Sequence, residues 1–300
     1  MRDEFLAIVN PAAGGGKPRK QLEPTLERLR AAGLSIDVGE TSAPGEATQI
    51  ARQAYRENYR KFIAVGGDGT SYEIVNGLFP EANAGERITM GFLPLGTGNS
   101  FLRDFSDRGF EFGAEALLNG CCRPCDVLRL RHTKGVIHYM NLLSMGFSAD
   151  VASLRSQWFR GWGELGYQLS IFLCLVRFRR RPFPLKIDDE ATSDRRSCLF
   201  LSFNNSKYTG GTMMIAPKAE INDGLIEYVR WGAIGRLGLI RNLPTLYDGT
   251  HIQHPLAERR AAKSIQFELD GPVDIMVDGE VLNLHCQTLD VLPSALNVVV

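Results

Sequence analysis

Three glycine-rich turns carry the residue types that bind phosphate groups. They contain Asn10 with glycines at 14–16, then Gly-Gly-Asp-Gly-Thr at 66–70 and Gly-Thr-Gly-Asn at 96–99. Glycine lets several backbone N–H groups approach a phosphate, and a helix that begins after the turn adds a favourable dipole. Three such turns, each directly after a predicted strand, indicate a phosphate-rich ligand.

Asp68 is the unusual member of these turns. A carboxylate among anion-binding amides is repulsive unless a cation lies between them, so we expect Asp68 near Mg²⁺ or hydrogen-bonded to hydroxyls. Thr70 and Thr97 can add hydroxyl donors. The chain has neither a Rossmann fingerprint nor a Walker A ending, which disfavours ordinary dinucleotide and P-loop sites.

Two further turns carry carboxylates. Asp278-Gly279-Glu280 is typical of a hairpin turn, and such a turn can also present a carboxylate into a cleft. Asn222-Asp223-Gly224 is either a solvent turn or a Mg²⁺ loop built from one carboxylate and backbone carbonyls.

The elements that position the first three turns alternate between strand and helix. Leu22, Leu26 and Leu29 predict the first helix, in which Pro24 marks either its start or a kink. Alternating strands and helices favour a parallel sheet covered on both faces, and ligands bind at the carboxyl ends of such strands. The predicted strands are residues 5–9, 34–38, 62–65 and 88–93.

From about residue 125 the segments become short and rich in β-forming residues. They predict a mostly antiparallel second domain, interrupted by one helical insertion over residues 153–178. The predicted strands are residues 127–131, 136–143, 184–188, 199–203, 225–231, 264–269, 273–277 and 287–292.

Composition limits the class of protein. The 300 residues predict two domains or one large one, and equal numbers of basic and acidic residues (34 each) give no reason to expect a nucleic-acid binder. The six cysteines show no repeated metal-binding spacing, which favours reduced thiols in the cytosol. The longest apolar run, residues 171–176, is too short to cross a bilayer. We therefore expect a soluble cytoplasmic protein, at most peripheral at the inner face of a membrane.

The ordered motifs resemble the diacylglycerol kinase catalytic family, which includes bacterial lipid kinases, sphingosine kinases and ceramide kinases. The resemblance rests on the first two turns, on Pro-Leu-Gly-Thr-Gly-Asn at 94–99, and on motifs that continue almost to the end of the chain. These later motifs lie at residues 204–205, 208–211, 216–219, 222–225 and 278–280.

The resemblance implies a fold. Residues 1–125 would form a three-layer α/β nucleotide-binding domain around a parallel sheet, similar to that of NAD kinase and phosphofructokinase. Residues 126–294 would form a mainly antiparallel β-sandwich that binds the lipid, with the active site in the cleft between the domains. The final segment, about residues 295–300, is a candidate to return to the first domain.

The resemblance also implies an activity. It is ATP-dependent phosphorylation of a lipid hydroxyl, with diacylglycerol as the leading acceptor and phosphatidic acid as product. The nearest alternative is a sphingosine or ceramide kinase. A soluble kinase similar to NAD kinase, or a non-catalytic nucleotide or lipid sensor, are further alternatives. The sequence also leaves open whether the chain forms a homodimer.

Site residues follow by position from the same resemblance. Asp68 would organise the site and its Mg²⁺, Glu280 would be the general base, and Asp278 would be a metal ligand or helper. Asp223 with backbone oxygens of Glu220 and Leu225 would form a separate structural Mg²⁺ site. The nucleotide-contacting residues would be Asn10, Thr41, Gly66, Gly67, Asp68, Gly69, Thr70, Ser71, Tyr72, Gly96, Thr97, Gly98 and Asn99.

Two positions depart from the family pattern. Tyr72 stands where the family often has Asn, and Ser100 stands where it commonly has Asp. The second departure removes a carboxylate from the cleft, which puts the metal arrangement in doubt and is the support for the sensor alternative.

A lipid substrate requires a surface that reaches the membrane. Residues 158–181 combine aromatic side chains, an apolar stretch and a basic cluster, a composition that suits peripheral contact with an anionic membrane. The alternative is a core helix that ends in a solvated basic turn.

Overall fold

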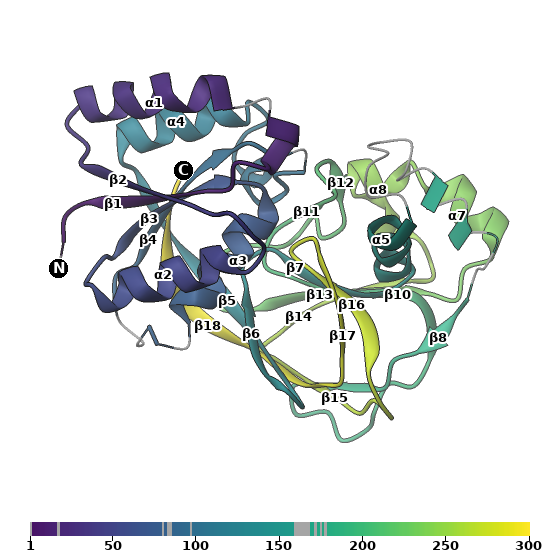
Figure 1. The fold of residues 1–300 in the computed structure, drawn as a ribbon. Coiled ribbons are helices and arrows are strands. Elements are labelled where there is room, and N and C mark those ends of the chain that lie inside the picture. The colour runs from purple at the N-terminus through teal and green to yellow at the C-terminus, as the bar shows by residue number, and fades with distance from the viewer. Residues whose placement is uncertain are drawn as a thin grey trace.

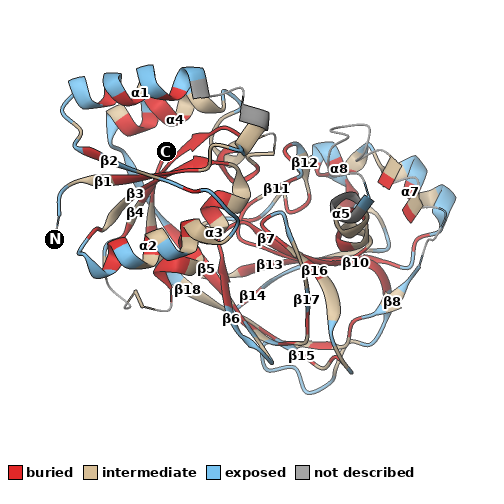
Figure 2. Cartoon of the chain, viewed as in Figure 1, coloured by how far each residue is buried: buried red, intermediate tan, exposed pale blue. Residues whose placement is uncertain are grey.

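The computed structural model describes residues 2–16, 19–79, 81–82, 86–96, 98–158, 169–170, 173–174, 176 and 179–300. It shows an α/β half that contains both chain ends beside a half built mainly of strands (Figure 1). Buried residues fill the sheets of both halves (Figure 2).

The N-terminal half is the predicted three-layer arrangement around parallel strands in the order β2-β1-β3-β4. Leu6 and Ile8 pack on one face with helices α2 and α3, whereas Ala7 and Val9 pack on the other with α1 and α4. The helix α1 runs through Pro24, so this proline neither starts nor ends it. The element bounds are β1 (Phe5–Val9), α1 (Arg19–Ala31), β2 (Ile36–Glu40), α2 (Glu46–Arg56), β3 (Lys61–Gly66), α3 (Asp68–Leu78), β4 (Thr89–Pro94) and α4 (Phe110–Asn119).

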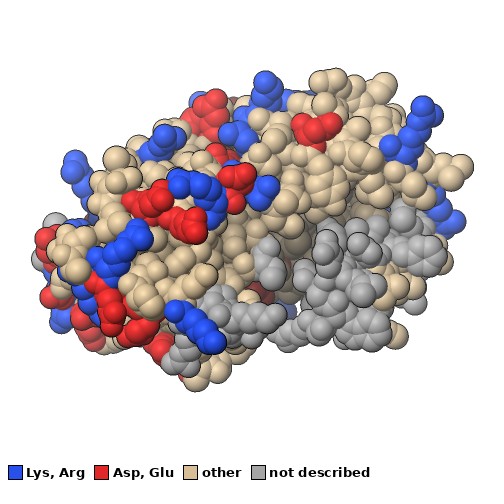
Figure 3. All heavy atoms as spheres, turned by 90° about the horizontal axis from the view of Figure 1, so that it is seen from above, with Lys and Arg blue, Asp and Glu red and all other residues tan. Residues whose placement is uncertain are grey.

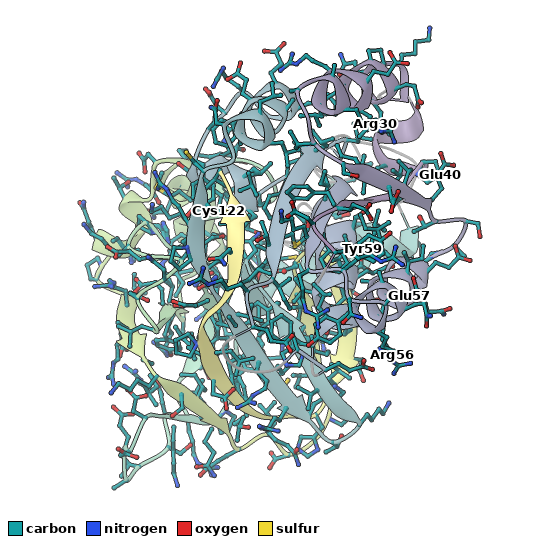
Figure 4. All side chains as sticks on the ribbon, turned by 90° about the vertical axis from the view of Figure 1, so that its left-hand side faces the viewer. Arg30, Glu40, Arg56, Glu57, Tyr59 and Cys122 are labelled. Carbon is teal, nitrogen blue, oxygen red and sulfur yellow. The ribbon has the colours of Figure 1, made fainter. Side chains whose placement is uncertain are left out.

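At the outer edge of this half, Arg30 of α1 donates a hydrogen bond to the carbonyl of Ile36 in β2 (3.0 Å). The Tyr59 hydroxyl contacts the Asp37 carboxylate, and Arg2 donates to the same hydroxyl (2.8 Å; Figure 4 labels Arg30 and Tyr59). These contacts tie the edge strand β2 to its neighbours.

One long strand connects the two halves. The strand β18 (Cys286–Val299) pairs along most of its length with β5 (Cys122–His132) in antiparallel fashion. Near its end, Asn297 and Val298 pair in parallel with Thr89 and Met90 of β4. The predicted strand over residues 287–292 is therefore only part of a longer element that continues into the N-terminal sheet.

The second half is an antiparallel sandwich, as predicted. One layer continues the N-terminal sheet, and the other has the order β14-β13-β10-β7-β16-β17. A core that includes Leu130, Leu143 and Phe203 lies between the layers. The first layer adds β6 (Gly135–Tyr139), β9 (Leu185–Ile187) and β15 (Ser264–Phe267); the second has β7 (Leu142–Gly146), β10 (Ser197–Asn204), β13 (Ile226–Gly232), β14 (Ala257–Ala262), β16 (Val273–Val277) and β17 (Glu280–Leu284), with β8 (Arg181–Pro182) beside β10.

The single strand predicted over residues 136–143 is wrong. The chain leaves β6 after Tyr139 and enters β7 at Leu142, and these two strands belong to different layers. The N–H groups of Met140, Asn141 and Leu142 donate to the Asp278 carboxylate, which stabilises the crossing between the layers.

The outer face of the second layer is apolar and covered. Phe200, Trp231, Leu239 and Leu246 form a separate cluster on this face. The predicted helical insertion over residues 153–178 corresponds in part to α5 (Phe147–Trp158); residues 159–168, 171–172, 175 and 177–178 of it lie outside the described residues. The sequence did not predict α7 (Arg236–Asn242), α8 (Thr245–Asp248) or the short hairpin of β11 (Tyr208–Thr209) and β12 (Met213–Met214).

Candidate active site

The second and third glycine turns pack directly on each other at the carboxyl edge of the parallel strands. The N–H of Leu95 donates to the carbonyl of Gly66 (2.8 Å). A β-carbon on Gly96 would lie 2.8 Å from the α-carbon of Gly67, and one on Gly66 would lie 2.2 Å from the Thr70 hydroxyl oxygen. A side chain at Gly96 would push the two turns apart, and one at Gly66 would collide with Thr70 within the second turn.

The first turn joins the same edge. The N–H of Asn10 donates to the carbonyl of Val65 at the end of β3 (2.9 Å), and the side-chain oxygen of Asn10 accepts from the N–H of Ala12 (3.1 Å). The buried Thr41 donates its hydroxyl to the carbonyl of Val9 (3.3 Å). The ends of β1, β2 and β3 therefore bring Asn10 and Thr41 to the edge that holds the second turn.

Asp68 begins helix α3, with Gly67 as the helix cap. Its carboxylate accepts a hydrogen bond from the N–H of Ser100 (2.9 Å) and lies 3.2 Å from where a β-carbon on Gly98 would be. Burial raises the pKa of Asp68, while donors on Ser100 and Phe101 act in the opposite direction. The third turn thus folds over the Asp68 carboxylate.

The third turn has a left-handed residue. Asn99 has φ +48° and donates its side-chain amide to the carbonyl of Gly96 (2.7 Å), which closes the turn. Thr97, predicted to contact the nucleotide, lies outside the described residues.

The predicted residues further along α3 lie deeper in the protein. The buried Thr70 hydroxyl oxygen has no hydrogen-bond partner in the described part of the chain, and Ser71 is also buried. Tyr72 packs against the sandwich core, and burial together with the charges of Asp278 and Glu280 raises its pKa. Tyr72 therefore contacts the second half of the molecule.

Asp278 and Glu280 lie on the predicted hairpin, which joins β16 to β17. Asp278 is 3% exposed, has φ +47°, and accepts hydrogen bonds from the N–H groups of Leu142 (2.9 Å), Asn141 (3.2 Å) and Met140 (3.2 Å). Burial raises its pKa to about 7; the Asp68 charge adds to this, and the three N–H donors oppose it.

Glu280 is exposed, and its carboxylate lies over the first turn of α3. One carboxylate oxygen is 2.8 Å from the position that a β-carbon would take on Gly69. The tertiary structure thus brings Asp68, Asp278 and Glu280 to one place: Asp278 fixes the hairpin tip, and Glu280 extends towards the glycine turns.

Sequence reasoning did not predict the contacts that join the two halves around this place. The Asn76 side chain donates to the carbonyl of His138 (2.8 Å) and accepts from its N–H (2.9 Å). The Ser100 hydroxyl accepts from the N–H of Gly211 (3.1 Å). The Asp104 carboxylate, on the short helix η2 (Phe101–Asp104), accepts from the N–H of Lys207 (3.0 and 3.2 Å). The available signal was the helical spacing: Asn76 lies four residues after Tyr72 on α3, so both side chains fall on one face of the helix.

A cavity of about 650 Å³ runs from the carboxylates into the second half. Asp68, Asp278 and Glu280 line its polar part. Phe147, Phe200, Trp231, Leu239 and Leu246 are among the residues that line its apolar part, between the outer face of the sheet and helices α5, α7 and α8. Sequence patterns did not indicate this cavity, because its walls come from distant segments.

The predicted structural Mg²⁺ loop has donors of the right type. Glu220 and Asp223 are exposed, and Asp223 accepts from the N–H of Leu225 (2.9 Å). Partial burial of its carboxylate and the charges of Asp126 and Glu220 raise the pKa of Asp223, so a cation at this loop would relieve repulsion. The described residues contain no cluster of three or more His, Cys, Asp or Glu side chains suited to a metal, so bound Mg²⁺ would need backbone oxygens as well.

The surface predicted to contact a membrane is described only in part. Trp158 is 69% exposed and Val176 is 56% exposed, with Arg179 and Arg180 also exposed. Within the described ranges, we find no helix that combines the length and the apolar character needed to cross a membrane. In the view of Figure 3, acidic and basic side chains intermingle over the N-terminal half and are sparser over the other half.

Comparisons with known proteins cover nearly the whole chain. The family model for the diacylglycerol kinase catalytic domain matches residues 4–130, and the model for the YegS C-terminal NAD kinase beta sandwich-like domain matches residues 141–300. A diacylglycerol kinase of Bacillus subtilis strain 168 is 27% identical over 95% of both chains. One from Staphylococcus aureus strain MRSA252 is 28% identical over 93% of this chain and 87% of its own.

The fold is also similar to that of solved structures. A crystal structure from Bacillus anthracis strain Sterne matches 99% of this chain and 95% of its own, with a TM-score of 0.78. Its sequence identity of 23% supports the fold alone. The α/β half and the sandwich therefore form a combination that is already known.

Proposed function

The chain belongs to the diacylglycerol kinase catalytic family, and from this premise we propose that it transfers the γ-phosphate of ATP to a lipid hydroxyl, with diacylglycerol as the leading acceptor. The observation that carries the proposal is the cavity, which joins the three carboxylates to an apolar wall. A lipid acceptor needs both the polar and the apolar part of the cavity, because its hydroxyl must reach the phosphate while its hydrocarbon avoids water.

The chain supplies the groups that phosphoryl transfer to an alcohol requires. The reaction depends on in-line positioning, on neutralisation of charge and on a base for the hydroxyl proton. The glycine turns at residues 66–70 and 96–99 offer backbone N–H groups to the phosphates. Glu280, exposed beside the start of α3, would accept the proton from the lipid hydroxyl.

Asp278 has a different role in this proposal. Its two carboxylate oxygens accept three backbone hydrogen bonds, so it orients the hairpin that carries Glu280. Asp68 would hold Mg²⁺ near the phosphates, where the ion would supply compensating positive charge. Asp223 with carbonyl oxygens of Glu220 and Leu225 would hold a second, structural Mg²⁺.

The access route would lie at a membrane surface. Exposed apolar side chains occur on α7 and α8, the helices that cover the cavity: Leu237 is 83% exposed, Ile240 50% and Tyr247 51%. Arg236 and Arg241 on α7, with Arg179 and Arg180, add positive charge that would attract an anionic cytoplasmic leaflet. We propose that this side, together with residues 158–181, contacts the membrane peripherally.

The test is a phosphorylation assay with purified protein, γ-labelled ATP and Mg²⁺. Mixed micelles carry diacylglycerol, ceramide, sphingosine or monoacylglycerol in separate reactions. We expect label in diacylglycerol, its loss in Glu280→Gln, and its retention in Glu57→Gln, which changes an exposed glutamate on the α/β half. Label in sphingosine or ceramide alone would change the acceptor. ATP binding without label in any lipid would favour the non-catalytic sensor.

A further inference from the structure

A buried serine lies on the sheet face that lines the cavity. Ser144 of β7 pairs in register with Ser202 of β10 and with Met276 of β16. Because side chains alternate along a strand, Leu143 and Met145 pack into the sandwich core, while Ser144 faces the other way, into the cavity. Ser144 is only 2% exposed.

The hydroxyl of Ser144 has no hydrogen-bond partner among the described residues, and neither does the buried hydroxyl of Ser148 at the start of α5. Both residues line the cavity. The neighbouring Ser202 differs, because its hydroxyl accepts a hydrogen bond from the Asn204 side chain (3.0 Å). Buried polar groups are normally paired, so two unpaired hydroxyls on one cavity wall indicate a ligand atom that pairs with them.

A third polar group on this wall limits which kind of ligand atom can pair with these side chains. Trp231 is fully buried and lines the cavity, and its indole nitrogen also has no partner in the described part of the chain. An indole N–H can only donate a hydrogen bond, so the ligand must offer acceptors. A carbonyl oxygen meets this requirement, whereas an ammonium group does not.

The serines lie between the two ends of the cavity. The N–H of Leu142 donates to Asp278, at the carboxylate end. Ser144 is two residues further along β7, roughly 7 Å at the usual rise per residue. Beyond it, Gly146 pairs with Phe200, which belongs to the apolar cluster. A ligand that extends from the carboxylates to the apolar cluster along this wall therefore passes Ser144.

We propose that Ser144 and Ser148 donate hydrogen bonds to a carbonyl oxygen in the acyl linkage of the lipid acceptor, and so determine which lipid is phosphorylated. This inference rests on the proposed lipid kinase function. In a diacylglycerol only two carbon atoms separate the free hydroxyl oxygen from the nearest ester oxygen. With the hydroxyl held at Glu280, this short linkage would put an ester between the carboxylates and the hydrocarbon chain, which would lie against Phe200 and Trp231.

The experiment compares lipids that differ only in this linkage. Mixed micelles carry diacylglycerol, the ether-linked dialkylglycerol of the same chain length, ceramide or sphingosine. Rates are measured for wild type, Ser144→Ala, Ser148→Ala and the control Ser197→Ala, which changes an exposed serine on β10. In parallel, the rise in Tm caused by each lipid is measured without ATP.

We expect wild type and Ser197→Ala to favour diacylglycerol over dialkylglycerol in both kcat/KM and the rise in Tm. Ser144→Ala should lower kcat/KM for the ester about 10-fold and leave the ether almost unchanged. If Ser144→Ala lowers kcat/KM for ceramide by the same factor, the carbonyl that the serines bind can belong to an amide. If Ser144→Ala lowers kcat/KM for no carbonyl-containing lipid, the proposal is overturned.

The two readouts separate this inference from the proposed function. Equal rates and equal Tm shifts for ester and ether would overturn the carbonyl subsite and leave the kinase intact. If no lipid is phosphorylated but diacylglycerol alone raises Tm, and Ser144→Ala removes this effect, the kinase function fails and the subsite stands. If neither phosphorylation nor a linkage-specific shift occurs, both are overturned.

Discussion

A carboxylate oxygen of Glu280 lies 2.8 Å from the position that a β-carbon would occupy on Gly69. Gly69 is in the first turn of α3, and Glu280 begins β17, more than 200 residues later in the chain. The absence of a side chain at Gly69 leaves room for the proposed base beside the phosphate-binding turn. Gly69 therefore matters both for the turn and for the position of the Glu280 carboxylate.

Gly69→Ala should separate activity from stability. Alanine is favoured over glycine in a helix by about 1 kcal/mol, and the displaced atom is the end of a flexible side chain, so Tm should stay the same or rise. A base displaced by about 1 Å should lower kcat about 10²-fold. Lipid kinase assays and thermal melts check this, with Gly271→Ala as control because a β-carbon there meets nothing within 4 Å. Full activity in Gly69→Ala would contradict the placement of Glu280.

The two carboxylates of the hairpin should respond differently to truncation. Asp278→Ala leaves three backbone N–H groups without their acceptor. Near pH 4, where the raised pKa of Asp278 no longer costs stability, we expect a loss of at least about 2 kcal/mol in unfolding free energy. Glu280→Ala removes an exposed side chain, and its unfolding free energy should stay within about 0.5 kcal/mol of wild type. Urea denaturation measures both, and equal losses would show that Asp278 has no special structural role.

Asn76 should hold the two halves together. Its side chain makes two hydrogen bonds to the backbone of His138 and a third to the carbonyl of Tyr72 (2.9 Å). Asn76→Ala should lower the unfolding free energy by about 2 kcal/mol. Asn76→Asp keeps the shape but places a carboxylate oxygen against the His138 carbonyl, so it should be no more stable than the alanine variant. Wild-type stability of Asn76→Asp would contradict this contact.

Asp104 should make stability depend on pH. Burial raises its pKa to about 6, so its ionised form is disfavoured in the folded protein. The difference from the ordinary value of 3.8 corresponds to about 3 kcal/mol. This cost is fully present above pH 6 and disappears as the pH falls towards 3.8. Asp104→Asn should therefore be more stable than wild type at pH 8, by up to this amount, and the advantage should shrink between pH 6 and pH 4. A difference that is independent of pH would show that Asp104 does not titrate in this range.

Mg²⁺ should stabilise the folded chain through Asp223. A cation that binds only the folded state raises stability by about 2.7 kcal/mol at one hundred times its dissociation constant. We expect Mg²⁺ to raise the Tm of wild type and of Glu280→Gln equally, and to raise that of Asp223→Ala less. An identical rise in Asp223→Ala would place the stabilising ion elsewhere.

The sequence alone was enough to predict those parts of the molecule that depend on residues close together in the chain. Alternation of apolar strands with helices predicted the parallel sheet, and its topology places the carboxyl ends of β1, β3 and β4 along one edge. The turns at Gly66 and Gly96 therefore had to meet, whatever followed them. The Asp-Gly pair at Asp278 likewise predicted a hairpin, because two residues suffice for that turn.

Only the tertiary structure determined which distant residues lie next to each of these turns and strands. Residues 136–143 look like one strand, yet the chain changes layers at Met140, and this crossing sets which side chains of β7 face the cavity. The Ser144 hydroxyl, for which the described residues offer no partner, the Glu280 carboxylate over Gly69 and the link from Ser100 to Gly211 all depend on segments that are distant in the chain. Side-chain alternation gives two faces to every strand, but the packing of the whole chain determines which face is core and which is cavity.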